Sequence, residues 1–316
     1  MTSASAAPGR PTVSIIVPTL TEEEDLPVLL ASIEAQSFTD YEIIVADAGS
    51  KDRTVQIARK AGAQVVPGGM PGPGRNRGAE AARGELLFFF DADVDLPRDF
   101  LAKAVAEMDA RMLDLATCEF RPKSDLKLDE IMFRFANLSV KMNQDINPRA
   151  AGFCIFITAR LFRRIGGFDE TLKLAEDHDL VQRASKFRPL RVLQNTSLKV
   201  SIRRLEKEGR FNLVQKYMQV ELHLLFKGNV RDEIVKYEFG NFGGDASQES
   251  GSGVLDDIEA RIIQIEKAYG EFTEALSETD GDSDSKGSGK AFFEKWRTGF
   301  DAAIKAFATI AKPPNK

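Results

Sequence analysis

An uninterrupted apolar run, Leu86–Phe90 (LLFFF), constrains the fold more than any other feature of the sequence. Successive side chains of a strand point to opposite faces, so a strand without polar positions must be buried on both faces. Such strands are typical of parallel sheets that helices cover on both sides. Asp91 and Asp93 follow this run directly. The sequence therefore predicts an α/β fold in which two acidic residues lie at the end of a central strand.

Strand-like and helix-like segments alternate before this run. The helix after the first strand has the spacing of a capping box, with Thr21 three residues before Glu24, so we expect it to begin there. The glycine- and proline-rich segment Gly68–Gly78 (GGMPGPGRNRG) predicts a surface loop that leads to a helix. The remaining elements predicted in this part are strands Val13–Val17, Glu42–Ala46 and Gln64–Val66 and helix Thr54–Ala61.

Composition excludes several classes of protein. Apolar residues make up 43% of the 316 residues, which is enough for a core and excludes wholesale disorder. Two cysteines and two histidines exclude a disulfide scaffold, a four-cysteine zinc site and a histidine-rich metal cage. No apolar run approaches the roughly 20 residues that span a bilayer, and the first ten residues lack the apolar stretch of a signal peptide. We therefore expect a cytoplasmic protein.

The net charge of −5 is concentrated near the C-terminus. The segment Asp245–Lys316 holds 14 acidic and nine basic residues, so residues 1–244 are balanced at 34 of each. Because a nucleic-acid-binding protein needs a basic face, this balance predicts no nucleic-acid partner.

Composition and apolar spacing predict five parts of the chain. Residues 1–10 form a flexible tail, and residues 11–120 and 121–242 form the two halves of the globular body. Residues 243–253 read as a flexible linker. Residues 254–312 carry two heptad-spaced apolar seams, which predict a coiled-coil-like helical hairpin. Such seams must be buried, either in the hairpin or a homo-oligomer, or by peripheral contact with the inner face of the membrane.

Several polar clusters carry candidate chemistry, and each has a simpler structural interpretation. Asp91 and Asp93 can share a divalent cation through oxygen, or form a solvated turn. Asp47 ends the second strand, where it either contacts a nucleotide or bonds its own turn. Arg75 lies in a glycine-rich segment that can face phosphate. Asp177 and Asp179 are candidate general bases, or acids that suit the dipole of a helix N-terminus.

These clusters resemble, in order and spacing, the motifs of family 2 glycosyltransferases with the GT-A fold. The resemblance covers about Pro11 to Gly209. It implies that residues 11–120 are a nucleotide-sugar-binding half and residues 121–242 an acceptor-binding and catalytic half. It implies a Rossmann-like, mostly parallel central sheet flanked by helices, to which the C-terminal hairpin is appended. The four motifs are VSIIVPTLTEEEDL, EIIVADAGSKDRT, GPGRNRGAEAARGELLFFFDAD and GGFDETLKLAEDHDL.

The resemblance implies metal-dependent transfer of a sugar from a UDP- or GDP-linked donor to a hydroxyl group of an acceptor. The acceptor is a lipid or a glycan. By resemblance, Asp91 and Asp93 hold Mn²⁺ or Mg²⁺, and Asp177 is the general base, with Asp179 as the fallback. The residues assigned by resemblance or by motif to nucleotide binding are Pro18, Thr19, Glu22, Asp47, Arg75, Asp91 and Arg204.

Two departures from the family pattern qualify this prediction. The common D-D-G-S motif is D-A-G-S here, and the Q-x-x-R-W motif of processive synthases is absent, with SIRRLEKEGR in its place. We therefore expect transfer of a single sugar, and the resemblance implies that the transfer proceeds with inversion. Two alternatives stay open, namely a retaining GT-A transferase, and an assembly protein that uses the hairpin and has a secondary or inactive transferase body.

Overall fold

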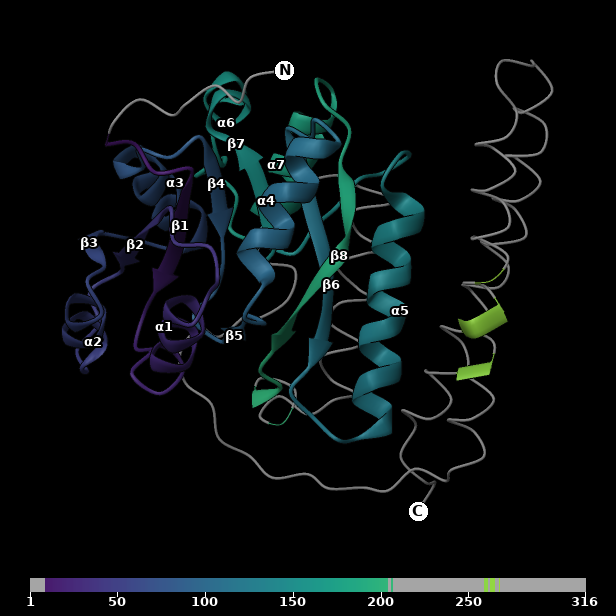
Figure 1. Cartoon of the computed structure of the whole chain (residues 1–316), viewed down its shortest axis with the longest axis horizontal. Coiled ribbons are helices and arrows are strands. Elements are labelled where there is room, and N and C mark those ends of the chain that lie inside the picture. Colours follow the sequence, from purple (N-terminus) through teal and green to yellow (C-terminus); the bar gives the residue numbers. More distant parts are fainter. Residues whose placement is uncertain (1–8, 204–205, 207–258, 261, 265–266, 268–316) are drawn as a thin grey trace. The chain divides into compact units, whose positions relative to one another are not determined.

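The computed structural model describes residues 9–203, 206, 259–260, 262–264 and 267 (Figure 1). These residues fall into two compact units. The first contains residues 9–123, 143–203 and 206, and the second contains residues 124–142 with the described residues from 259 onward. The predicted hairpin 254–312 therefore lies almost entirely outside the described residues, and so do the tail 1–8 and the linker.

The first unit is built on one mixed sheet of eight strands in the order β3-β2-β1-β4-β7-β6-β8-β5. The strands β3, β2, β1 and β4 are parallel to one another, as the alternating pattern predicts. Strand β7 is antiparallel to both β4 and β6, while β6 and β8 are parallel. The strands are β1 Val13–Thr19, β2 Tyr41–Asp47, β3 Gln64–Pro67, β4 Leu86–Phe89, β5 Val94–Asp95, β6 Leu115–Pro122, β7 Ile155–Thr158 and β8 Arg191–Val200.

Helices cover both faces of this sheet, and α4 passes in front of it in Figure 1. Strand β4 supplies core residues to both faces, as its sequence predicts. Phe88 and Phe90 pack with Phe100 of α4 and Phe156 of β7. Phe89 on the other face packs with α6 and with the segment before α7. The helices of this unit are α1 Leu26–Glu34, α2 Thr54–Lys60, α3 Pro71–Ala81, α4 Phe100–Ala110, α6 Ala159–Ile165 and α7 Glu176–Ser185.

The predicted loop Gly68–Gly78 is wrong for most of its length, because helix α3 begins at Pro71. Proline at the first position of a helix fits, since the missing N–H has no partner there anyway. The glycines allow close packing rather than breaking the helix. A Cβ at Gly78 would lie 2.4 Å from Ile16 Cγ2 of β1, so only glycine lets α3 approach the sheet this closely.

The predicted capping box at Thr21 is also wrong. Helix α1 begins at Leu26, and its N-cap, Asp25, makes no side-chain cap hydrogen bond. Thr21 has a φ of 60°, which is left-handed, and its N–H donates to Ser50 Oγ instead. Contacts with the loop after β2 therefore decide the conformation of this segment.

The other half of the sheet contains a register shift between β6 and β8, at Cys118 and Glu119. The side chain of Glu107, from α4, supports the displaced segment of β8. Its carboxylate accepts hydrogen bonds from the backbone N–H groups of Gln194 and Asn195 at 2.9–3.0 Å, and it pairs with Arg111. This buried carboxylate is therefore satisfied by the strand that it supports.

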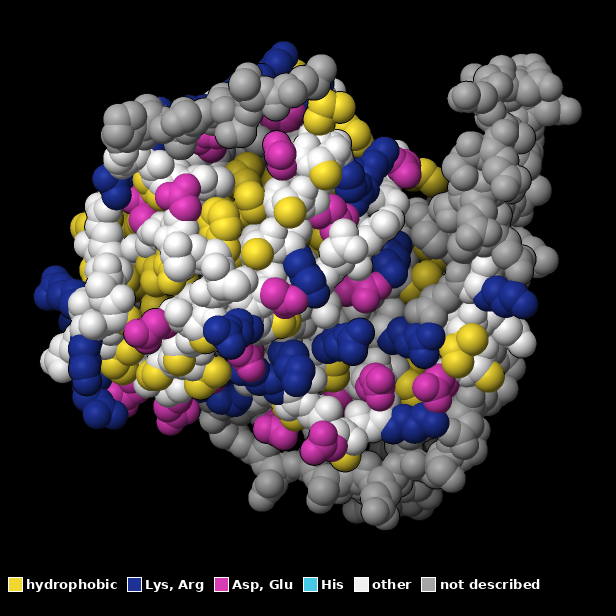
Figure 2. Space-filling model, in the orientation of Figure 1, with side chains coloured by type: hydrophobic (Ala, Val, Ile, Leu, Met, Phe, Trp, Pro, Cys, Tyr) yellow, Lys and Arg dark blue, Asp and Glu magenta, His cyan; other side chains and the backbone are white. Residues whose placement is uncertain are grey.

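The second unit is described mainly by helix α5, Lys127–Asn143. Within this unit Lys127 Nζ lies 2.7 Å from Glu259 Oε2. In the part of the chain that the structure describes, no helix is long and apolar enough to cross a membrane. Basic and acidic side chains are interspersed on the face shown in Figure 2, and no continuous basic patch is visible there.

Candidate functional site

The carboxyl ends of β2, β1 and β4 lie side by side, because these three strands are parallel neighbours. Thr19 and Asp47 are register partners at the last position of β1 and β2. Asp91 comes two residues after the end of β4. Ligands of open α/β sheets bind at such an edge. The predicted site residues Pro18, Thr19, Asp47 and Asp91 are thus placed along one edge of the sheet.

The carboxylate of Asp47 is occupied by its own turn. Oδ2 accepts the N–H groups of Gly49 and Ser50, both at 2.9 Å. Oδ1 accepts the hydroxyls of Ser50 at 2.5 Å and Thr19 at 3.1 Å. This is the turn chemistry that the sequence offered as the simpler interpretation. The contact of Asp47 with a nucleotide stays a prediction, and these hydrogen bonds fix the position of its carboxylate.

Backbone N–H groups of the loop after β1 donate hydrogen bonds to side chains that follow β2. Thr54 Oγ1 accepts from Glu22 at 2.8 Å, and Asp52 Oδ2 accepts from Glu23 at 3.1 Å. Asp52 Oδ1 also accepts the N–H and the hydroxyl of Thr54, although the N-cap of α2 is Arg53. These contacts fix the position of Glu22.

Glu22 belongs to an acidic cluster with Asp25, Asp91 and Asp93, and Arg203 lies beside it. Arg203 Nη2 lies 2.7 Å from Asp25 Oδ2 and 3.5 Å from Glu22 Oε2. Burial, and next the charge of Asp93, raise the pKa of Glu22 to about 8. Burial, and next the charge of Asp91, raise the pKa of Asp93 to about 7. Burial and the neighbouring carboxylates therefore disfavour the ionised forms of both residues.

A bridge connects Asp91 to the start of helix α7. Arg75 of α3 is only 3% exposed, and its Nη2 donates to Asp91 Oδ1 at 2.8 Å. Nη1 donates to Glu176 Oε1, also at 2.8 Å. Burial disfavours the charge of this guanidinium, but Asp91, Glu176 and Asp177 outweigh burial and raise the pKa of Arg75. Arg75 thus joins the two acidic motifs that the sequence singled out separately.

Asp177 lies in the first turn of α7, with its carboxylate held by two backbone donors. Oδ2 accepts the N–H of Gly152 and Oδ1 the N–H of His178, each at 2.8 Å. The helix starts from Ala175, whose left-handed φ of 61° is uncommon for a residue with a Cβ. Asp179, in contrast, is 7% exposed and accepts from Arg183 Nε at 2.7 Å within the same helix.

The structure brings most of the predicted residues into two linked groups. Glu22, Asp91 and Asp93 form the acidic cluster, and Arg75 connects Asp91 to the segment of Asp177. Arg204 lies outside the described residues. Sequence reasoning gave no role to Asp25 or Gly152. The only sequence signal for Asp25 was its place in an acidic run. For Gly152 the only signal was a single glycine between Ala151 and Phe153.

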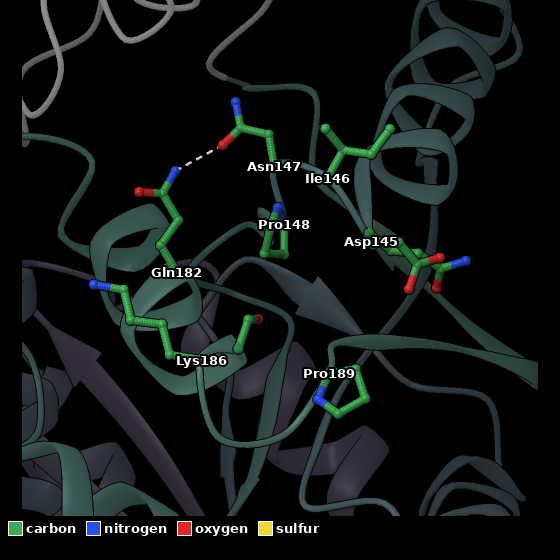
Figure 3. Close-up of a pocket in the computed structure, with 9 residues that line it drawn as sticks. Asp145, Ile146, Asn147, Pro148, Gln182, Lys186 and Pro189 are labelled. Carbon is green, nitrogen blue, oxygen red and sulfur yellow. Dashed lines mark hydrogen bonds between the residues drawn. The ribbon is translucent and has the colours of Figure 1, made fainter. Parts of the chain in front are cut away.

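A pocket of about 390 Å³ lies near the C-terminal end of α7 and contains none of the predicted site residues (Figure 3). Gln182 and Asn147 bond across it at 2.9 Å, and Lys186, Pro148 and Pro189 also line it. This hollow is therefore separate from the candidate site.

Comparisons with known proteins identify the family and the fold. Residues 14–165 match the family described as Glycosyl transferase family 2. The chain carries a family 2 glycosyltransferase domain. An uncharacterized glycosyltransferase of Mycobacterium tuberculosis is 39% identical over 116 residues, which are 36% of this chain and 51% of the relative. The poly(ribitol-phosphate) beta-N-acetylglucosaminyltransferase TarS of Staphylococcus aureus is 30% identical over 182 residues, 54% of this chain and 32% of TarS.

Solved structures show the same GT-A-like fold. Residues 1–349 of S. aureus TarS, in complex with UDP-GlcNAc, align with a TM-score of 0.51 and 25% identity, covering 60% of this chain and 58% of that one. The mannosyltransferase PcManGT from Pyrobaculum calidifontis, in complex with GDP-Man and Mn²⁺, aligns with a TM-score of 0.51 and 18% identity, covering 95% and 86%. This chain spans about half the length of the mycobacterial relatives and about a third of TarS.

Proposed function

We propose that this family 2 domain transfers a single sugar from a nucleotide-diphosphate sugar to an acceptor hydroxyl, with inversion. The observation that carries the proposal is the link from Asp91 through Arg75 to the start of α7, where Asp177 lies. It connects the acids suited to a donor's metal ion with the acid suited to deprotonating an acceptor. The complexes of TarS with UDP-GlcNAc and of PcManGT with GDP-Man support a nucleotide-sugar donor.

The donor nucleotide occupies the edge formed by β2, β1 and β4 in this proposal. Pro18 and Thr19 line it from β1, and Asp47 contacts the base from the end of β2. Glu22 and Asp91 approach it from the acidic cluster. Arg75 and Arg204 contribute positive charge toward the diphosphate. Ligand binding at this edge follows from the parallel arrangement of the three strands.

The proposal extends to a divalent metal ion at the acidic cluster. The donors are carboxylate oxygens, which Mg²⁺ and Mn²⁺ accept. The raised pKa values of Glu22 and Asp93 mean that their ionised forms are disfavoured, and a bound cation would favour those forms. In the described residues no three acidic, cysteine or histidine side chains are arranged as a complete metal site. Asp91 and Asp93 would hold the ion, which, when bound, neutralises charge on the departing nucleoside diphosphate.

Asp177 acts as the general base. Its carboxylate takes the proton of the acceptor hydroxyl while that oxygen bonds to the anomeric carbon. The bond from this carbon to the diphosphate breaks, and the nucleoside diphosphate leaves with the electron pair. The N–H groups of Gly152 and His178 orient the carboxylate during this step. The pairing of Asp179 with Arg183 leaves it the second choice for this role.

The other assignments are extensions of the same proposal. Residues 11–120 bind the donor, and residues 121–242 supply the base and the acceptor-binding surface. The acceptor is a lipid or a glycan. Residues 254–312 mediate self-association or a peripheral membrane contact at the cytoplasmic face.

The experiment that tests the proposal is thermal unfolding with UDP-, GDP- and dTDP-sugars, each with and without Mn²⁺. A ligand at 100 times its Kd stabilises a protein by about 2.7 kcal/mol, so binding gives a readable rise in Tm. We expect a metal-dependent rise with sugars of one nucleotide, and a loss of that metal dependence in Asp93→Asn. Wild-type protein that responds to none of these donors contradicts the proposal.

A further inference from the structure

The guanidinium of Arg75 lies in a buried space that exists because nearby positions are glycine. Helix α3 can approach β1 because Gly78 lies against Ile16. On the other side, a Cβ at Gly152 would lie 2.4 Å from Arg75 Nη2 and 2.7 Å from its Cζ. Gly152 does not have a left-handed φ, so its backbone suits other residues and only the lack of space requires glycine there.

Both terminal nitrogens of Arg75 are engaged by protein carboxylates. Nη2 and Nη1 each form a 2.8 Å ion pair, with Asp91 and Glu176 respectively. The guanidinium also lies 5.6 Å from the centre of the Phe168 ring. Its side chain is 4% exposed, whereas that of Asp91 is 39% exposed. A ligand in the site therefore reaches Asp91 readily and Arg75 hardly at all.

The two ion pairs of Arg75, which form a bridge from Asp91 to Glu176, connect segments that are far apart in the sequence. Asp91 follows the central strand β4, and Glu176 begins helix α7, immediately before Asp177. The main chain of Gly152, whose missing side chain makes room for Arg75, donates to Asp177 at 2.8 Å. Displacing the guanidinium would therefore disturb both the Glu176 ion pair and the peptide that orients the base.

From these contacts we propose that Arg75 is a positioning residue, which fixes Asp177 relative to Asp91 through Glu176 and Gly152 and does not bind the nucleotide directly. The inference rests on the proposed transfer reaction and gives Arg75 a different role from the nucleotide contact that its motif predicts. A planar guanidinium can hold two carboxylates in fixed directions, whereas a lysine ammonium is a single point charge. Charge alone therefore does not replace Arg75.

The test compares Arg75→Lys, Arg75→Ala and Gly152→Ala with the wild-type protein. In Arg75→Lys, kcat for sugar transfer falls by about 10²-fold, the loss expected when a base is misplaced by about 1 Å. The KM for the donor and the Kd for UDP–Mn²⁺ or GDP–Mn²⁺, whichever the protein binds, stay at the wild-type values. Gly152→Ala, which keeps the arginine but fills its space, gives the same separation of kcat from KM. Added guanidinium ion partly restores the rate of Arg75→Ala.

Arg77→Ala is the matched control. Arg77 lies on the same helix, is exposed and donates to the carbonyl of Gly68, so its removal leaves kcat unchanged. Hydrogen exchange supplies a readout that does not depend on activity. Amides at the start of α7 exchange faster in Arg75→Lys than in Arg77→Ala, because the bridge no longer holds that turn.

Two results overturn the inference in an active enzyme. A tenfold or larger rise in the nucleotide Kd of Arg75→Lys with kcat unchanged makes Arg75 a direct ligand. Unchanged kcat in both Arg75→Lys and Gly152→Ala removes any positioning role. If the wild-type protein turns over no nucleotide sugar, the proposed function is overturned instead. In that case, hydrogen exchange at the start of α7 that is the same in Arg75→Lys as in the wild-type protein rejects the positioning role of Arg75.

Discussion

Two groups of carboxylates in the sheet-bearing unit are removed from water but differ in what surrounds them. Glu107 supports the β6–β8 register shift and accepts hydrogen bonds from two backbone N–H groups of β8 and from the side chains of Asn195 and Arg111. Burial alone would raise its pKa, but these donors outweigh burial and lower it. Glu22 and Asp93 lie among other carboxylates, and their pKa values rise to about 8 and about 7.

This difference separates a structural carboxylate from one that is available to a ligand. The protein supplies every donor that Glu107 needs, so that residue stabilises the fold and has no further task. Burial and neighbouring carboxylates disfavour the ionised forms of Glu22 and Asp93, which makes these residues candidates for the metal ion that we propose. Four predictions test this distinction, beginning with the largest expected effect.

Asp177→Asn should reduce the turnover of sugar transfer by about 10²–10⁴-fold, because the amide cannot accept the acceptor's proton. Its Tm should change little, since an amide oxygen still accepts the N–H of Gly152 or His178. Steady-state kinetics and thermal unfolding measure the two effects. Asp179→Asn is the control. It should lower the free energy of unfolding, because it weakens the contact with Arg183, and should change turnover less than Asp177→Asn does. The reverse pattern would identify Asp179 as the base.

Glu107→Gln should lower the free energy of unfolding by about 1.5–3 kcal/mol, the usual contribution of hydrogen bonds to a charged group. Because folding lowers the pKa of Glu107, its ionised form stabilises the protein above the ordinary value of 4.5, and this contribution disappears as the pH falls through the folded-state pKa. Urea unfolding at pH 7 and at a pH well below 4.5 should therefore show a larger effect of the substitution at pH 7.

The exposed Glu80 on α3 provides the control for Glu107. Glu80→Gln should leave the unfolding free energy unchanged at both pH values. An equal loss of stability in the two variants would show that the hydrogen bonds of Glu107 are not the cause.

Ala175→Gly should raise the unfolding free energy by about 0.5–1 kcal/mol, because a left-handed residue with a Cβ costs roughly 1–2 kcal/mol and glycine returns part of this as chain entropy. Met112→Gly is the matched control, since Met112 also has a positive φ of 51° and is 88% exposed. Both variants should gain stability in chemical unfolding. A loss in Ala175→Gly alone would mean that the methyl group of Ala175 contributes packing.

Asp93→Asn should give the smallest change, a modest rise in Tm of the metal-free protein, because it removes one charge from the crowded cluster. The same substitution should abolish stabilisation by Mn²⁺ with a nucleotide sugar. Differential scanning calorimetry with and without Mn²⁺ measures both. A fall in Tm without metal would place Asp93 with Glu107, as a carboxylate on which the fold depends.

The sequence predicted the core of the sheet better than the segments around the site. The five apolar residues Leu86–Phe90 permit only burial on both faces, and β4 has that environment. In contrast, α3 contains residues that usually end helices, and Thr21 with Glu24 has the spacing of a cap that does not form. At both places tertiary contacts outweigh local preference, through the packing of Gly78 on Ile16 and the bond from Thr21 N–H to Ser50.

The sequence by itself determined which chemistry this protein offers. Acidic pairs after an apolar strand and at the start of a later helix are readable as motifs, because strand and helix periods place them without knowledge of distant contacts. Only the tertiary structure decided how these motifs are connected. Arg75 meets Asp91 after 16 residues but Glu176 only after 101, and Gly152 makes the space between them. No local periodicity encodes such a bridge, since it exists only where three separate segments of the chain pack together.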